Sequence, residues 1–472
     1  MKKLTTIALA TASLAAAGCK DSSSVPPVNA PTVEAVSGAL SRTSLQPLAT
    51  GVLAQDRSAV VGTFTYLTLA GILGRDVYRI DQSEPRYVQE TLGVNPDPGS
   101  FAGGGGFAGF YTAIRAANSL ILNLPTAPAT ELSAAEKNAT AGFLKTIKAL
   151  EYMRLIELRD TVGVPIQTDN PDEVTPIRCK EAVLAYAAAL LDSANTDLSA
   201  AGGTTKLPFV LPSGFTSHGR DYSVVSNIVL FNRGLKGKVD VLRAINRKSP
   251  NAAAATAAIA ELTQALGGAA AGAVSGTTFQ FGPFYHFVSS GSEATANPRS
   301  DAKIGLNPLV RDSLQAGDAR GSKITTRTTL SGQGISTSVT CTLCVATLAN
   351  SEAPLGILRD EELVLLRAQA YIAAGNLVGA AADINSVRTF YGLAPVAAFA
   401  STRAAIDAVL YEKRYSLLYE GPQRLVDLRE YGRLNATFLR RETSTDPFNA
   451  AFPLPRAELN ARNLTSNPAC TA

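Results

Sequence analysis

The sequence predicts an all-α protein, built from antiparallel helix pairs of the tetratricopeptide type with long irregular loops and minor β hairpins. Three observations favour this class. The 472-residue chain is 46% hydrophobic and only 17% charged, which indicates a large apolar core. Apolar residues recur at helical spacing over most of the chain. Residues 358–390 carry the small-residue pattern of a tetratricopeptide repeat.

The first 18 residues have the features of a signal peptide. Lys2 and Lys3 form a positive start, and the apolar or small residues 4–17 are too few to span a bilayer. The run Leu14-Ala-Ala-Ala-Gly-Cys19 is similar to a bacterial lipobox, in which the cysteine is lipidated after cleavage. We therefore expect a lipid anchor on Cys19. The alternative is ordinary secretory cleavage with an incidental cysteine.

A polar segment follows the predicted cleavage site. Residues 19–31 are rich in Ser and Pro, as expected of a lipidated tether. Residues 32–472 show no clear change of composition, which predicts a single helical binding domain. Lys20 beside the anchor is similar to the pattern of outer-membrane lipoproteins, so we expect attachment to the outer membrane. Lys20-Asp21 only weakly resembles surface-export signals, so the surface-facing orientation is preferred and the opposite face is the alternative.

Helical periodicity predicts the order of the helices. They cover residues 32–48, 53–73, 110–124, 134–159, 181–198, 226–246, 252–266, 358–374, 377–390 and 404–419. The helix at 134–159 is the longest and places Phe143, Ile147 and Leu150 on one side. Residues 226–266 form a hairpin, because Ser249-Pro-Asn interrupts the helical pattern.

The helix pair at 358–390 supplies the repeat signal. Tyr371, Gly375, Ala380 and Ile384 have the offsets of a tetratricopeptide repeat. Gly375 is expected to end the first helix in a left-handed conformation. The small side chain of Ala380 allows the second helix to approach the first closely, since neither helix can bury its apolar stripe alone.

Long segments rich in Gly, Ser, Thr, Pro and aromatic residues separate the helices. They cover residues 74–107, 202–222, 271–300 and 319–352. Loops of this length in a compact protein are usually functional. Four cysteines remain after Cys19, namely Cys179, Cys341, Cys344 and Cys470, and they allow three pairings. Cys341 and Cys344 lie in a Thr/Ser/Val-rich context that favours a structural disulfide.

Composition and motifs exclude several functions. A net charge of +4 predicts no nucleic-acid partner. The chain has only two histidines, His218 and His286, so we expect no His-rich metal site and no metal. The glycine run 103–106 lacks the context of a nucleotide-binding loop. No credible nucleophile or acid–base pair is visible, so we expect neither catalysis nor a cofactor.

Two loops combine the residue types that bind nutrients. Charged and aromatic residues hydrogen-bond hydroxyl groups and cover the apolar face of a sugar. The sequence therefore gives as candidate ligand-binding residues Asp76, Tyr78, Arg79, Arg86, Tyr87, Phe284 and Tyr285. For the aromatic run 279–287, the alternative is a half-buried structural strand or loop.

Six segments in a fixed order resemble one family. They are Tyr111-x-x-Ile114-x-x-Ala117-Asn118, residues 149–155 with Gly163-Val-Pro165, Asn307-Pro308 with Asp318-Ala-Arg320, Ile357-Leu-Arg359 with Asn385-x-Val387-Arg388, Glu412-Lys-Arg414 through Glu420-Gly421 to Asp427, and Phe452-Pro-Leu-Pro455-x-x-Glu458. Together with the lipobox, these motifs resemble the SusD/RagB family of nutrient-uptake outer-membrane lipoproteins.

The resemblance implies a SusD-like fold and a non-catalytic role. It implies a lipoprotein that binds a glycan or peptide and delivers it to a SusC-type TonB-dependent transporter. The alternative function is an α-solenoid scaffold that organises envelope proteins without a small ligand. The charged signature residues are expected to form ion pairs within and between helices, namely Glu412, Arg414, Glu420, Arg424 and Asp427.

Overall fold

A computed structural model describes most of the chain after residue 38. The described residues are 39–62, 65–79, 84, 86–93, 96–100, 106–168, 170, 173–290, 297–301, 303–325, 330–333, 338–341, 344–345, 351–439 and 447–466. The predicted signal peptide, Cys19, the tether and Cys470 lie outside them. Cys179 is disulfide-bonded.

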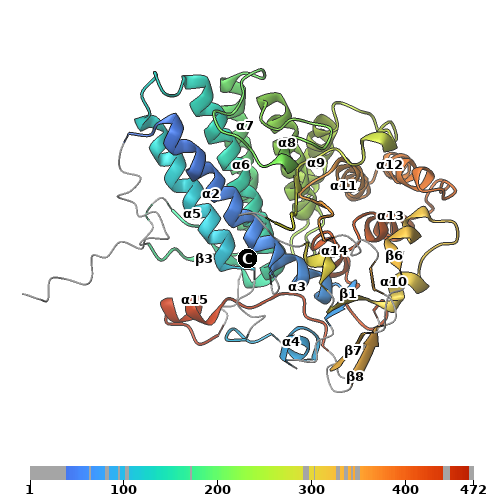
Figure 1. Ribbon diagram of the computed structural model, residues 1–472. Helices are drawn as coiled ribbons and strands as arrows, with labels where there is room; N and C mark the ends of the chain where they lie inside the picture. Colours follow the sequence, from blue (N-terminus) through green and yellow to red (C-terminus); the bar gives the residue numbers. More distant parts are fainter. Residues whose placement is uncertain are drawn as a thin grey trace, which may run out of the picture.

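Helices form most of the described structure (Figure 1), which confirms the predicted fold class. They are α2 (Arg42–Val61), α3 (Tyr66–Leu73), α4 (Arg86–Val88), α5 (Ala108–Asn123), α6 (Ala134–Arg159), α7 (Lys180–Ala201), α8 (Val225–Ala244), α9 (Ala252–Ala265), α10 (Pro308–Asp312), α11 (Asp360–Ala373), α12 (Leu377–Phe390), α13 (Thr402–Ser416), α14 (Gln423–Glu430) and α15 (Arg456–Ala461). The sequence patterns missed α4, α10, α14 and α15, which are all short.

The first half of the chain forms a bundle around α6. Helices α5, α7 and α8 pack on α6, and α2 packs on α5, as Figure 1 shows. Helix α6 begins at a capping box, in which Ser133 and Glu136 satisfy each other's backbone N–H groups. This local signal explains why the predicted range 134–159 is confirmed.

The second half continues as antiparallel helix pairs. Helix α9 packs on α8, and α11 packs on α8, α9, α12 and α13. Gly375 has φ +77° and ends α11, and the Asn376 side chain accepts a hydrogen bond from the backbone N–H of Gly379 at 2.9 Å. The predicted range 377–390 and the left-handed glycine are both confirmed. Ala380 is fully buried in the pair.

The predicted break between residues 48 and 53 is wrong. Helix α2 runs without interruption from Arg42 to Val61, with Pro47 inside it, and α3 is a separate helix. Ser41 caps α2 and fixes its start. Burial of Leu45, Ala49 and Val52 on one side outweighs the local helix-breaking tendency of Pro47.

Five two-stranded antiparallel sheets occur among the described residues, and three of them join loops that are distant in sequence. The pairs are β1 (Val77–Arg79) with β5 (Ile304–Leu306), β4 (Phe284–Tyr285) with β10 (Leu355–Gly356), β2 (Val164–Pro165) with β3 (Ile177–Arg178), β6 (Ile324–Thr325) with β9 (Cys344–Val345), and β7 (Leu330–Gln333) with β8 (Ser338–Cys341). They are short, as the sequence predicts for the β structure, and β7–β8 is a hairpin of consecutive strands. Among the described helices, none combines the length and apolar character needed to cross a membrane.

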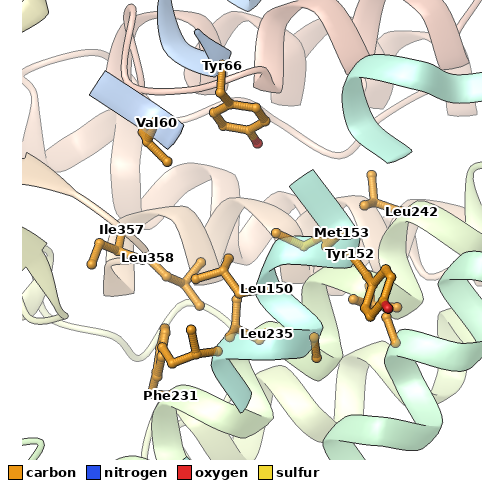
Figure 2. Packing of buried hydrophobic residues seen from close by; sticks show 14 of the residues in the cluster. Val60, Tyr66, Leu150, Tyr152, Met153, Phe231, Leu235, Leu242, Ile357 and Leu358 are labelled. Carbon is orange, nitrogen blue, oxygen red and sulfur yellow. The ribbon is translucent and has the colours of Figure 1, made fainter. Parts of the chain in front are cut away.

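The apolar core extends through both halves. One cluster of buried side chains includes residues from α2 through α15. Figure 2 shows part of it, where Val60 of α2 and Tyr66 of α3 lie near Leu150 and Met153 of α6, with Ile357 from the segment before α11. The helix bundle and the helix pairs therefore share one apolar interior.

Buried ion pairs join the helices of the second half, as the sequence predicts for the signature residues. Glu412 contacts Arg320 and Arg388, each at 2.7 Å. Glu420 contacts Arg359 at 3.0 Å, and Asp427 contacts Lys413 at 2.8 Å. Arg414 contacts Asp76 at 3.5 Å, and Arg424 lies close enough to the same carboxylate to lower its pKa. These side chains therefore have structural partners.

Candidate functional site

The first three candidate ligand residues are buried. Asp76, Tyr78 and Arg79 expose only 3%, 6% and 4% of their surface. Burial raises the pKa of Asp76, and Arg414 opposes that rise. Arg79 contacts Asp301 at 3.2 Å and lies over the ring of Tyr87. The geometry gives these three residues structural contacts within the protein, so it does not support a ligand role for them.

Arg86 and Tyr87 are placed differently. Arg86 is exposed and forms an ion pair with Glu84 at 2.8 Å, while Tyr87 is half-buried. Both lie in or beside α4, at the edge of the fold in Figure 1. A ligand contact by these two residues stays a prediction.

Phe284 and Tyr285 form the buried strand β4. The Tyr285 hydroxyl donates a hydrogen bond to Asp56 at 2.7 Å and accepts one from Arg154 at 2.8 Å. Burial is the main cause that raises the pKa of Tyr285. The structure therefore fits the alternative of a structural aromatic strand, because the partners that bury it come from α2 and α6.

A cleft of about 410 Å³ lies elsewhere, between α5, the β2–β3 segment and α15. A second cavity, beside Tyr66 and Tyr285, is much smaller, at about 20 Å³. Aromatic, charged and amide side chains line it, including Phe107, Tyr111, Arg115, Gln167, Glu173, Glu458 and Arg462. None of the seven candidate residues from the sequence is among them.

Local structure builds each wall of the cleft. Gly163 has φ +77° and turns the chain after α6 into β2, which pairs with β3. The Tyr111 hydroxyl of α5 donates a hydrogen bond to the carbonyl oxygen of Pro165 at 2.6 Å. Arg462, beside α15, donates to the carbonyl oxygen of Thr175 and contacts Glu458 at 2.7 Å. These contacts hold three distant segments around one space.

The cleft has positively and negatively charged side chains beside aromatic rings. Arg115 and Glu173 are exposed, whereas Phe107 and Tyr111 are buried. The buried guanidinium of Arg159 lies over the Phe107 ring at 5.3 Å, and burial lowers the pKa of Arg159 to about 9. Burial also raises the pKa of Tyr111, so its phenol stays neutral and keeps its hydrogen-bonding proton at neutral pH.

The lining can bind a polar ligand. Arg115, Gln167 and Glu173 offer donors and acceptors for hydroxyl, amide or charged groups. The lining includes no His, Cys or Ser, and no cluster of three or more metal-ligating side chains occurs among the described residues. The chemistry present therefore suits recognition of a ligand.

The sequence could reveal only part of this cleft. Tyr111 and Glu458 belong to family-like motifs, but nothing links them to each other or to Glu173. In the sequence, Arg115 and Arg462 look like ordinary charged surface residues. Only the packing of α5 and α15 around the β2–β3 segment brings these residues together.

Comparison with known proteins gives structural matches. The sequence matches no known family profile and no curated protein. The structure is similar to a SusD superfamily protein from Parabacteroides distasonis, with a TM-score of 0.63 and 15% identity over 89% of this chain and 98% of that one. It is also similar to surface glycan-binding protein A from Bacteroides uniformis, with a TM-score of 0.63 and 13% identity over 89% and 99%.

A third similar structure is a laminarin-binding SusD-like protein, with a TM-score of 0.59 and 17% identity over 89% of this chain and 98% of that one. In each case nearly the whole of the other chain is covered. The chain therefore has the SusD-like fold, as its sequence motifs predict.

Proposed function

We propose that this protein is a glycan-binding lipoprotein of a nutrient-uptake system, and that its ligand occupies the cleft between α5 and α15. The single observation that carries the proposal is this cleft, because it joins exposed charges to aromatic rings within a SusD-like fold. Two of the similar structures are glycan-binding by their names, which supports a glycan over a peptide.

The geometry of the cleft suits a sugar chain. The rings of Tyr111 and Phe107 lie under the lining with centroids 4.8 Å apart, and because they expose only 8% and 5% of their surface, a sugar would contact them by their edges. Arg115 and Glu173 stand at the exposed part of the lining, where they reach hydroxyl groups. Charged hydrogen bonds of this kind contribute about 1.5–3 kcal/mol each.

Calorimetric titration of the purified protein tests the binding site. The probes are laminarin and starch oligosaccharides and short peptides. Arg115→Ala and Glu173→Ala are expected to weaken binding roughly tenfold or more. Arg311→Ala and Asp312→Ala are matched controls, because this exposed ion pair lies in α10 and outside the cleft lining. Equal affinities in all four variants would remove the cleft from the site.

The loop that includes Arg86 and Tyr87 is the competing location. Arg86→Ala and Tyr87→Ala belong in the same titration, since these residues remain accessible candidates. If they weaken binding while the cleft variants do not, the N-terminal loop is the ligand site. Turnover of a bound oligosaccharide by the pure protein would contradict the non-catalytic role.

The proposal includes a SusC-type TonB-dependent transporter as partner and a lipid anchor on Cys19. Both follow from the family resemblance of the sequence motifs. Purification through a tag on this protein, followed by mass spectrometry, identifies the partner. A TonB-dependent barrel that copurifies in stoichiometric amount is the expected result. Its absence from a preparation that retains lipid would favour the alternative of an envelope scaffold.

A further inference from the structure

The two histidines of the chain meet at one point, although 68 residues separate them. The Nε2 atoms of His218 and His286 lie 2.7 Å apart, in hydrogen-bonding contact. Both side chains are half-buried, so one side of the pair faces solvent. A neutral imidazole has one N–H, and the contact requires that one of the two facing nitrogens is an acceptor.

Neighbouring groups fix the orientation of both rings. The Ser213 hydroxyl lies 2.9 Å from Nδ1 of His286. The ring of His218 stacks on Phe284, with centroids 4.0 Å apart and planes 25° apart. A hydrogen bond to the outer ring nitrogen and a packed ring face are the devices that orient histidine ligands of metal ions.

The backbone also holds the two loops together. The backbone N–H of Gly282 donates a hydrogen bond to the carbonyl oxygen of His218 at 3.2 Å. A Cβ atom at Gly214 would lie 2.0 Å from the carbonyl oxygen of Phe284, so only glycine permits this approach. The convergence of the two imidazoles is therefore built into the fold.

We propose that His218 and His286 bind a single divalent transition-metal ion through their two Nε2 atoms. Tetrahedral coordination at Zn–N distances of about 2.0–2.1 Å places the two nitrogens ~3.3 Å apart, so the rings separate by about half an ångström. Water fills the remaining positions on the exposed side. This site is smaller than the His-rich cluster that composition excludes, and neither histidine lines the cleft.

The surroundings decide which ions fit. Arg57 lies over the ring of Phe287, next to His286, and its positive charge opposes hard cations that are held by charge alone. Imidazole nitrogen instead suits Zn²⁺, Ni²⁺ and Cu²⁺, which are held by coordination. The site is therefore expected to bind Zn²⁺ and to leave Ca²⁺ and Mg²⁺ unbound.

Titration of the full-length, oxidised protein with Zn²⁺ tests the proposal. One equivalent is expected to bind, and His218→Gln or His286→Gln is expected to weaken Zn²⁺ binding at least tenfold. Thr216→Ala, at an exposed neighbouring position, serves as the control and is expected to bind as the wild type does. A double Cys341→Ser/Cys344→Ser variant excludes binding by thiols.

A second measurement needs no variant. Diethyl pyrocarbonate modifies neutral imidazole, and peptide mass spectrometry can follow both histidines of the wild-type protein separately. Zn²⁺ is expected to protect both histidines, whereas Ca²⁺ protects neither. No Zn²⁺ binding, undiminished binding in both glutamine variants, or unchanged modification of both histidines with Zn²⁺ present would each overturn the proposal. If the glutamine variants fail to fold, the protection result decides.

Discussion

Several residues that look like ligand contacts in the sequence are buried among partners within the protein. The segment 75–87 is rich in charge, which is typical of a surface loop, yet Asp76 and Arg79 are buried. Their partners, Arg414 and Asp301, lie hundreds of residues away, so no local pattern could reveal them. Tertiary contacts decide whether a charged side chain is buried, and a single sequence does not show which residues pair with each other.

Tyr285 illustrates the same point and gives a stability prediction. Its hydroxyl joins Asp56 to Arg154 in a buried network. Tyr285→Phe is expected to lower the free energy of unfolding by about 1–3 kcal/mol, because it leaves buried polar groups unsatisfied. Urea denaturation measures the change, with Tyr87→Phe as the half-buried control. Equal stability of the two variants would show that the network contributes nothing.

Asp160 gives a prediction with a pH dependence. Its buried carboxylate contacts Lys180 at 3.1 Å and Arg429 at 3.3 Å, and Arg247 also pairs with it. Arg429 and the other cations lower the pKa of Asp160 far below its usual value, against the effect of burial. Because the pKa of Asp160 is lower in the folded protein than in the unfolded chain, its charge stabilises the fold above the unfolded-state pKa of about 3.9. This stabilisation is lost as the pH falls from there toward the folded-state pKa.

Asp160→Asn is therefore expected to destabilise the protein by about 3 kcal/mol at pH 7, since it leaves buried cations without one carboxylate. The difference from wild type should shrink below about pH 4, because Asp160 then binds a proton in the unfolded chain and this favours unfolding of the wild type. Urea unfolding at several pH values measures it, and Asp312→Asn, in an exposed ion pair, is the control. A constant difference at every pH would contradict the assignment.

At the scale of elements, local signals predict helix ends well wherever the signal is a cap. Ser133 begins α6 and Gly375 ends α11, and both ends fall close to where the sequence places them. The interior of α2 shows the limit, because the break predicted between residues 48 and 53 lies inside a continuous helix that is held by apolar packing. The cleft could not be predicted, since α15 is short and β2–β3 pairs only two residues on each side.

The helix pair α11–α12 provides an element-level test. Ala380 is fully buried, whereas Val378, on the same helix, is 80% exposed. Ala380→Glu is expected to cost several kcal/mol, because it places a charge in a close helix–helix contact. Val378→Glu is the matched control and should leave the melting temperature nearly unchanged. A melting temperature for Ala380→Glu equal to that of the control would contradict the packing of this pair.

At the scale of the whole molecule, motif order predicts the fold better than any single element does. Each of the six segments is a weak signal, but their order from Tyr111 to Glu458 matches one architecture, and the structural comparisons agree with it. Structure also explains why the motifs are informative, since Glu412, Glu420 and Asp427 form ion pairs that join segments distant from one another in the fold. The motifs encode the frame, and two of their residues, Tyr111 and Glu458, also line the proposed ligand cleft.

The proposed lipid anchor makes a prediction for the whole chain. Cys19→Ala is expected to yield an unprocessed or soluble product, because two or three acyl chains are what hold such a protein durably at a membrane. Fractionation of cells after a carbonate wash measures it, in a strain without the proposed transporter. If the variant still sediments with the outer membrane there, the anchor lies elsewhere.

The central claim is that the cleft between α5 and α15 holds the ligand. The most direct measurement is a crystal structure of the protein with the oligosaccharide that binds most tightly in the titration. We expect sugar density in the cleft, with hydroxyl groups in contact with Arg115 and Glu173 and a ring at the edge of Tyr111. A ligand bound beside Arg86 and Tyr87, with the cleft empty, would contradict the claim.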